Sequence, residues 1–218
     1  MPNAPFLVVA AASVEIRPFV RSLNGARATV ETLVTGIGKA SCHRAVTRRL
    51  REGRYRAVVS AGFAGGTRPG LKTGDLLVAS AVVDAASGRR FTPSPVAITE
   101  GAGFFRGLLV TAEKIQPDPD SKKELGRRLG AVAVDMETAA VAQVAQELGL
   151  PWVALRAILD PMEERLCVTS AGKAAAMALS PSGLRQLLRF FTCVRTAGHS
   201  LARGLPLVCG ERLGSSYS

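Results

Sequence analysis

Short apolar runs alternate along this chain with segments whose apolar residues recur every three or four positions. Apolar runs of roughly four to eight residues, bounded by glycine, proline or charged residues, are typical of buried strands. The pattern predicts strands over Phe6–Ala12, Thr29–Thr35, Arg56–Ala61, Asp75–Val83, Gly107–Ala112, Ala131–Val134 and Trp152–Leu159.

Helical spacing fills several of the intervals between these strands. It predicts helices over Lys39–Arg51, Ser121–Leu129, Glu137–Leu148 and Ser182–Ala202. Strands interleaved with helices are typical of α/β folds. We therefore expect a three-layer α/β/α architecture with a largely parallel mixed sheet, forming a single domain over residues 1–218. Its core should cover about residues 5–203, with a frayed tail at 210–218.

Length and composition narrow the class of protein. The chain has 218 residues, of which 47% are hydrophobic, so it is long enough to bury a substantial core. No apolar run approaches the roughly 20 residues that cross a bilayer. The first apolar run has no basic residue before it, and Glu15 and Arg17 interrupt the apolar pattern soon after it, which favours a strand over a signal peptide. We expect a cytoplasmic protein.

The net charge of +11 comes mostly from arginine. A basic field favours anionic ligands, acidic membrane surfaces or nucleic acid. Aromatic residues make up only 5% of the chain and do not interleave with basic ones, which argues against nucleic acid. The four cysteines form no CxxC pair and only His43 and His199 accompany them, so we expect no metal site.

Acidic residues stand at the ends of two successive strands. Asp135 and Glu137 follow one apolar strand, and Asp160 ends the next. Ionised carboxylates beside buried strands are costly unless they are paired, hydrogen-bonded or given a ligand. In open α/β sheets, ligands bind at the carboxyl ends of the strands. The sequence therefore predicts a ligand site here, and Arg156 should pair with one of these acids because a buried guanidinium needs a partner.

Two glycine-rich segments are candidate loops at the same edge. Gly36-Ile37-Gly38 joins a strand to a helix whose N-terminal amides suit an anion or a polar oxygen. Ser41 stands at the third glycine position of a dinucleotide fingerprint, and the expected acidic residue is absent downstream, so the motif is weak. Gly62–Gly66 should form a loop that lets backbone approach a ligand closely. A tight turn packed against a helix is the alternative for each segment.

Five segments, taken in this order, resemble the nucleoside phosphorylase/nucleosidase superfamily: Glu15, Gly36–Gly38, Gly62–Gly66 with Gly74-Asp75, Ala133–Glu137 and Arg156–Asp160. The resemblance covers about residues 5–165 and looks closest to the methylthioadenosine/S-adenosylhomocysteine nucleosidases and the hopanoid-associated phosphorylases. It implies an enzyme that cleaves the N-glycosidic bond of a purine nucleoside of the adenosine type.

The resemblance also implies roles for individual residues. Glu15 matches the residue that activates water, Glu137 would hold the ribose hydroxyls, and Asp160 would protonate the leaving purine. The remaining substrate contacts would be Met136, Gly62, Phe63, Ala64 and Asp135. The candidate ligands for an anion or phosphate are Gly36, Gly38, Arg44 and Arg68. No cofactor is implied, apart from inorganic phosphate as the co-substrate of a phosphorylase.

Simpler interpretations of the acids remain open from the residues alone. Glu15 could cap the first helix, and Asp160 could begin a turn before Pro161. Glu137 could be an acid favoured by the helix dipole, and Asp135 could be structural.

The chain also departs from the family pattern. Leu159 replaces the serine that usually precedes the catalytic aspartate, and Phe63 stands where a small or hydroxyl residue is common. The segment 84–107 is short, which would leave the 5′ side of the sugar uncovered. A purine-stacking aromatic residue is not evident near residues 113–115.

Three functions therefore compete. The first is a nucleosidase that uses water activated by Glu15. The second is a phosphate-dependent phosphorylase, including one that cleaves an adenosylated hopanoid lipid. The third is a catalytically inactive nucleoside-binding protein, supported by Leu159. The resemblance implies a homodimer or a higher homo-oligomer, and the basic surface adds peripheral contact with a membrane-borne substrate as a further expectation.

Overall fold

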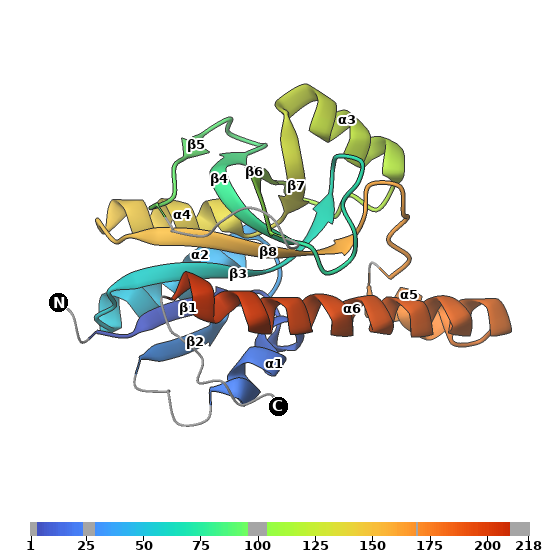
Figure 1. Ribbon diagram of the computed structural model, residues 1–218, viewed down its shortest axis with the longest axis horizontal. Helices are drawn as coiled ribbons and strands as arrows, with labels where there is room; N and C mark the ends of the chain where they lie inside the picture. The colour runs from blue at the N-terminus through green and yellow to red at the C-terminus, as the bar shows by residue number, and fades with distance from the viewer. Residues whose placement is uncertain (1–3, 24–28, 96–103, 169, 210–218) are drawn as a thin grey trace.

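The computed structural model describes residues 4–23, 29–95, 104–168 and 170–209 (Figure 1). Within these residues one mixed sheet is surrounded by helices. The strands are β1 (Phe6–Ala10), β2 (Val30–Val34), β3 (Ala57–Gly66), β4 (Leu76–Asp84), β5 (Arg90–Phe91), β6 (Phe104–Thr111), β7 (Ala131–Asp135) and β8 (Trp152–Asp160). The helices are α1 (Ser13–Ser22), α2 (Lys39–Glu52), α3 (Pro119–Leu129), α4 (Thr138–Glu147), α5 (Ala171–Met177) and α6 (Pro181–Val208).

The strands β2, β1, β3 and β8 lie side by side as parallel neighbours. β4 pairs antiparallel with β8, and β6 and β7 continue the sheet from β4 as parallel partners. β7 then returns to β3 through the antiparallel pairs Gly65–Val134 and Gly66–Ala133. The strands β3, β8, β4, β6 and β7 therefore close into a ring. The largely parallel mixed sheet with helices on both sides confirms the predicted fold class, to which the structure adds this closure.

Both faces of the central strands are buried, because successive residues of a strand point to opposite sides. On one side Leu7 and Val58 pack with residues of α2 and α4. On the other side their neighbours Val8 and Val59 pack with residues of α1 and α6. Two-sided burial explains why these strands read as continuous apolar runs in the sequence.

The predicted end of the third strand is wrong. β3 does not stop at Ala61 but continues through the glycine segment to Gly66, with a shift of register between Ala64 and Gly65. Its backbone is paired with β8 from Gly62 to Gly65 and with β7 at Gly65 and Gly66, so Gly62–Gly66 is strand rather than loop. The glycines leave room for side chains from other elements: a Cβ atom on Gly62 would lie 2.8 Å from Oε1 of Glu15.

Other differences concern the ends of the chain and two short elements. α6 runs along the sheet, and its N-terminal part continues past the sheet toward α5 (Figure 1). Its C-terminal end lies at Val208, beyond the predicted limit of Ala202. The short elements β5 and α5 were not predicted. The tail at 210–218 lies outside the described residues. No described helix is long and apolar enough to span a membrane.

Candidate active site

Glu15 lies in the first turn of α1, and its side chain points toward β3. The carboxylate accepts one hydrogen bond from the backbone N–H of Ala12 (2.8 Å) and another from that of Phe63 (2.9 Å). Glu15 is 8% exposed, and this burial raises its pKa, while the two N–H groups and Arg156 act in the opposite direction. Glu15 thus caps α1, as the simpler interpretation expected, and also fixes a buried carboxylate against the glycine-rich part of β3.

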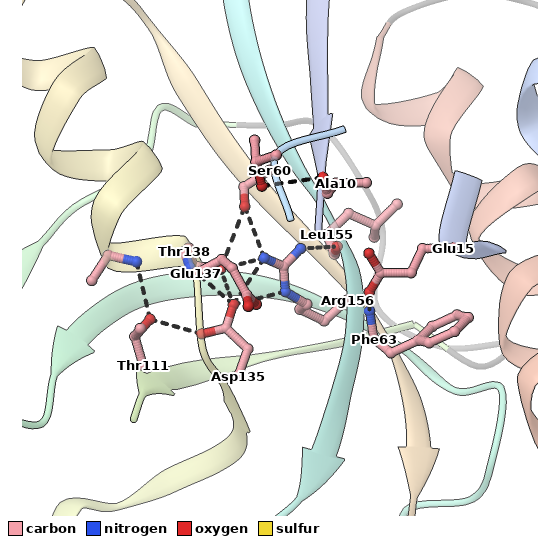
Figure 2. Close-up of polar contacts among 12 residues, drawn as sticks. Ala10, Glu15, Ser60, Phe63, Thr111, Asp135, Glu137, Thr138, Leu155 and Arg156 are labelled. Carbon is pink, nitrogen blue, oxygen red and sulfur yellow. Dashed lines mark hydrogen bonds and ion pairs between the residues drawn. The ribbon is translucent and has the colours of Figure 1, made fainter. Parts of the chain in front are cut away.

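A buried polar network lies beneath the site (Figure 2). Arg156 of β8 donates from Nε to Oδ2 of Asp135 (2.9 Å). Its Nη2 atom donates to the hydroxyls of Ser60 (2.8 Å) and Thr138 (2.6 Å). The other carboxylate oxygen of Asp135 accepts from the hydroxyl of Thr111 (2.7 Å). The predicted pairing of Arg156 with one of the acids is confirmed.

This network changes the interpretation of Asp135. Its side chain is 0% exposed, and both of its oxygens accept hydrogen bonds from the protein. The structure makes Asp135 the counter-ion of Arg156, which supports the structural interpretation of this acid, and its contact with a substrate stays a prediction. Arg156 needs this carboxylate, because a buried guanidinium without a counter-ion would strongly destabilise the fold.

Glu137 joins two segments that are far apart in the sequence. It precedes α4 directly, and its Oε1 accepts a hydrogen bond from the backbone N–H of Gly38 (2.7 Å). Gly38 begins α2 with a φ of 96°, a conformation that glycine adopts without strain. Burial and the charge of Asp135 raise the pKa of Glu137 to about 7, against the influence of Gly38 and Arg156.

The candidate anion ligands do not gather around a common point. The N–H of Gly38 is already used by Glu137. Arg44 is exposed on α2, with its guanidinium 3.5 Å from the hydroxyl of Ser41. Arg68 is exposed and stacks over the ring of Phe105, 5.4 Å from its centroid. Among the described residues, neither arginine forms an ion pair with an acid of the site.

Asp160 ends β8 and has a partner that the sequence reasoning missed. Nζ of Lys122 donates to Oδ2 of Asp160 at 2.8 Å, and the lysine side chain is 0% exposed. Burial raises the pKa of Asp160 to about 6, while Lys122 opposes that rise. A signal was available, because Lys122 precedes Leu125 by three positions and so shares the buried face of the helix.

A glycine of α3 allows this lysine and this aspartate to meet. A Cβ atom on Gly126, one turn after Lys122, would lie 2.1 Å from the carbonyl oxygen of Thr67, so α3 approaches the end of β3 only because the residue is glycine. On β3, a Cβ atom on Gly65 would lie 3.4 Å from Oδ2 of Asp160. The close approach therefore depends on Gly126, whereas at Gly65 an added Cβ would only be in ordinary van der Waals contact with Asp160.

The remaining predicted contacts lie around these acids. Phe63 is half-buried and packs on the apolar cluster shared by α1 and α6, while Ala64 is buried on the opposite side of β3. Met136 is half-buried between Asp135 and Glu137. Leu159 also packs on the cluster shared by α1 and α6, and its carbonyl accepts from the hydroxyl of Thr73 (3.1 Å). The side chain of Leu159 therefore provides no polar contact to the neighbouring acid.

A separate hollow of about 440 Å³ lies between α3 and the segments after β4 and β6. Its lining includes Glu113, Lys114 and Gln116. None of the three candidate acids lines it. The hollow is therefore not the site that these acids form.

Glu15 of α1 and Glu137 at the start of α4 are close enough for the charge of Glu15 to affect the pKa of Glu137, while Asp160 lies at the end of β8 beside Gly65 of β3. Figure 2 shows Glu15 and Glu137 on either side of Arg156. Glu15, Glu137 and Asp160 all have raised pKa values, with burial as the largest cause. Buried carboxyl groups of raised pKa in one region are suited to general acid and base chemistry and to stabilising a developing cation.

Comparison with known proteins agrees with this arrangement. The model of the phosphorylase superfamily matches residues 16–180. A 5′-methylthioadenosine/S-adenosylhomocysteine nucleosidase of Geobacillus kaustophilus is 28% identical over 200 residues, covering 77% of this chain and 84% of the relative. The same enzyme of Bacillus subtilis is 30% identical over 155 residues, covering 59% of this chain and 66% of the relative.

Solved structures share the fold. The nucleosidase of Neisseria meningitidis in complex with methylthio-immucillin-A superimposes with a TM-score of 0.73 at 22% identity, covering 94% of this chain and 98% of that one. Futalosine hydrolase of Helicobacter pylori gives a TM-score of 0.73 at 20% identity, covering 96% and 98%. The resemblance inferred from the sequence is confirmed, and the chain belongs to the phosphorylase superfamily.

Proposed function

We propose that this protein hydrolyses the N-glycosidic bond of a purine nucleoside of the adenosine type. The observation that carries the proposal is the buried carboxylate of Glu15, held by two backbone N–H groups close to Gly62. The chain's nucleosidase relatives support the reaction class, and the enzymatic character expected from the sequence agrees with its family.

Each acid has a distinct task in this reaction. Glu15 takes a proton from water, and the water oxygen bonds to the anomeric carbon as the bond from that carbon to the purine nitrogen breaks. Glu137 accepts hydrogen bonds from the ribose hydroxyls and stabilises the positive charge that develops on the sugar. Asp160 donates its proton to the purine, so the products are the free base and the sugar with a hydroxyl at the anomeric carbon.

The state of the candidate phosphate ligands favours hydrolysis over phosphorolysis. Phosphate would need cationic or N–H donors at the site, but the N–H of Gly38 is bonded to Glu137 and both Arg44 and Arg68 are exposed. The net charge of +11 is the main support for the phosphorylase alternative, including cleavage of an adenosylated hopanoid lipid. The inactive binding protein rests on Leu159, and the contact of Lys122 with Asp160 weakens that argument.

The test is release of base from methylthioadenosine and from an adenosine with a bulky 5′ substituent, with and without inorganic phosphate. We expect release without phosphate, and Glu15→Gln and Asp160→Asn should each lower kcat/KM by ~10²–10⁴ because acid–base help is lost. Glu52→Gln, at an exposed site on α2, is the matched control and should retain full activity.

The other outcomes separate the alternatives. Release that requires phosphate and yields a sugar 1-phosphate would identify a phosphorylase and leave Glu15 without its proposed task. Binding of both nucleosides with no release under either condition would identify a nucleoside-binding protein.

A further inference from the structure

Lys122 is a fully buried lysine whose donors are all used. Its Nζ donates to Oδ2 of Asp160 (2.8 Å), to the carbonyl of Pro161 (2.6 Å) and to the carbonyl of Glu164 (2.6 Å). An ammonium group has three N–H donors and no acceptor, so these bonds satisfy it completely. A buried charge is costly unless it is paired and hydrogen-bonded in this way. Lys122 is therefore a specifically bound, buried ammonium group and not a solvated surface lysine.

The contact with Lys122 gives Asp160 a polar partner, which the preceding residue, Leu159, does not provide. Leu159 carries no hydroxyl, and its side chain packs on the apolar cluster shared by α1 and α6. The polar partner of Asp160 comes instead from α3, an element that precedes β8 by a strand and a helix. The close approach of α3 at Gly126 brings the ammonium group into reach.

We propose that Lys122 is the positioning residue of Asp160, holding Oδ2 so that Oδ1 carries the proton, and stabilising the carboxylate that remains after proton transfer. The proposal rests on the proposed function, in which Asp160 protonates the leaving purine. In that step the O–H bond at Oδ1 breaks, an N–H bond forms on the purine, and the electron pair stays on the carboxylate. The ammonium group is already in place to stabilise this new buried charge.

The charges that face Asp160 come from two elements. Lys122 approaches from α3, and Glu164 lies in the segment after β8. Glu164 is itself paired with Arg189 of α6 at 2.8 Å. The adjacent part of β3 contributes Gly65 and no charge. Lys122 is thus the cation that opposes the effect of burial on the pKa of Asp160, and its removal should let that pKa rise above about 6.

The experiment is the pH profile of kcat/KM for base release in Lys122→Met. At high pH kcat/KM falls as Asp160 loses its proton, and we call this fall the alkaline limb of the profile. Without Lys122 the acid should keep its proton to higher pH, so we expect the limb to move to higher pH by about one unit or more. Below that limb the rate should fall roughly 10²-fold, because the carboxylate product has lost its counter-ion. Lys123→Met removes the same charge from an exposed position of α3 and should change neither the limb nor the rate.

A purely structural lysine would behave differently. Its loss would lower kcat/KM by the same factor at every pH and leave the limb in place, and this result would overturn the proposal. Lys122→Arg retains the charge with a poorer fit, so its rate should fall while the limb stays near that of the unmodified protein. If Lys122→Met does not fold, Lys122→Arg decides the matter, since an upward shift with the charge retained would be fatal to the proposal.

Failure of the proposed function would look different again. Full activity in Asp160→Asn would remove the acid role of Asp160, whatever Lys122 does. An inactive Asp160→Asn variant together with an unmoved limb in Lys122→Met would reject only the role of Lys122.

Discussion

At the scale of single residues, the acids of the site depend on neighbours that have no side chain. Glu15 is the clearest case, because a Cβ atom on Gly62 would lie 2.8 Å from its Oε1 atom. The sequence pointed to Gly62 as a residue that lets a ligand approach. The structure shows that the nearer occupant of that space is a carboxylate of the same chain.

The variant Gly62→Ala tests this packing. The added methyl group should displace the carboxylate of Glu15 from its bond to Phe63, and kcat/KM for base release should fall by ~10² as a general base loses its position. Gly172→Ala is the control, since a Cβ atom there meets nothing within 4 Å. Unchanged kinetics in Gly62→Ala, with Gly172→Ala also active, would show that the position of Glu15 is unimportant.

Glu137 makes stability depend on pH in a defined direction. Its pKa is raised from 4.5 to about 7 in the folded protein, so the folded state binds this proton more tightly than the unfolded state does. The resulting stabilisation is complete below 4.5 and is lost as the pH rises through about 7. We therefore expect Tm to fall across this window, with Asp160 contributing in the same direction at slightly lower pH.

Glu137→Gln should reduce this fall in Tm, because glutamine does not titrate. Thermal unfolding of both proteins in buffers on either side of the window measures the difference. An identical loss of Tm in the variant would show that Glu137 does not hold the proton.

At the scale of elements, the network of Arg156 connects β8, β7, β3 and the start of α4. Asp135→Asn would leave a buried guanidinium without its counter-ion, and we expect a loss of about 3–5 kcal/mol in the free energy of unfolding. Denaturant unfolding measures this loss. Glu124→Gln breaks an exposed ion pair with Arg127 and should leave the free energy of unfolding nearly unchanged. Similar values for the two variants would argue that the network carries little stability.

Most elements could be predicted because their apolar periodicity is strong. The helix from Lys39 and the strand to Asp160 were placed within a residue or two of α2 and β8. β3 was cut short because glycine is read as a breaker, and only the pairing of β3 with β8 and β7 shows why it is tolerated. Lys122 was missed because a lysine in an otherwise charged helix is normally solvated, and its burial depends on a contact 38 positions away.

At the scale of the whole molecule, the α/β class and the family could be predicted, whereas the closure of the strands could not. Closure depends on β7 returning to the end of β3, and no local pattern encodes a pairing of only two residues on each side. The candidate acids could be named from motif order, but their partners come from tertiary contacts between distant segments. The homo-oligomeric state stays a prediction, and sedimentation showing a fully active monomer would contradict it.

The charge distribution gives a prediction for membranes. Between Arg165 and Cys209 the sequence contains six lysines and arginines and no acidic residue. Along α6, Leu184, Leu188 and Phe191 are exposed beside these arginines. Basic amphipathic helices bind anionic lipid surfaces. We expect the protein to sediment with vesicles of phosphatidylcholine and phosphatidylglycerol in equal parts, but not with phosphatidylcholine alone.

Two matched variants locate this binding. Arg195→Gln should weaken it by roughly fivefold, the value of one cation near an anionic surface. Arg48→Gln removes the same charge from an exposed position of α2 and should have a smaller effect. Equal effects of the two variants would show that only net charge matters, and no sedimentation with either vesicle would contradict the prediction.

The ring formed by β3, β8, β4, β6 and β7 has a consequence for motion. Enzymes that close over a ligand by rotating two lobes need a seam that few hydrogen bonds cross. Here Phe63 of β3 donates to Glu15 and Gly65 of β3 lies beside Asp160, and this part of β3 is hydrogen-bonded to β8 and, at its end, to β7. One continuous strand of the scaffold therefore fixes the places of both Glu15 and Asp160.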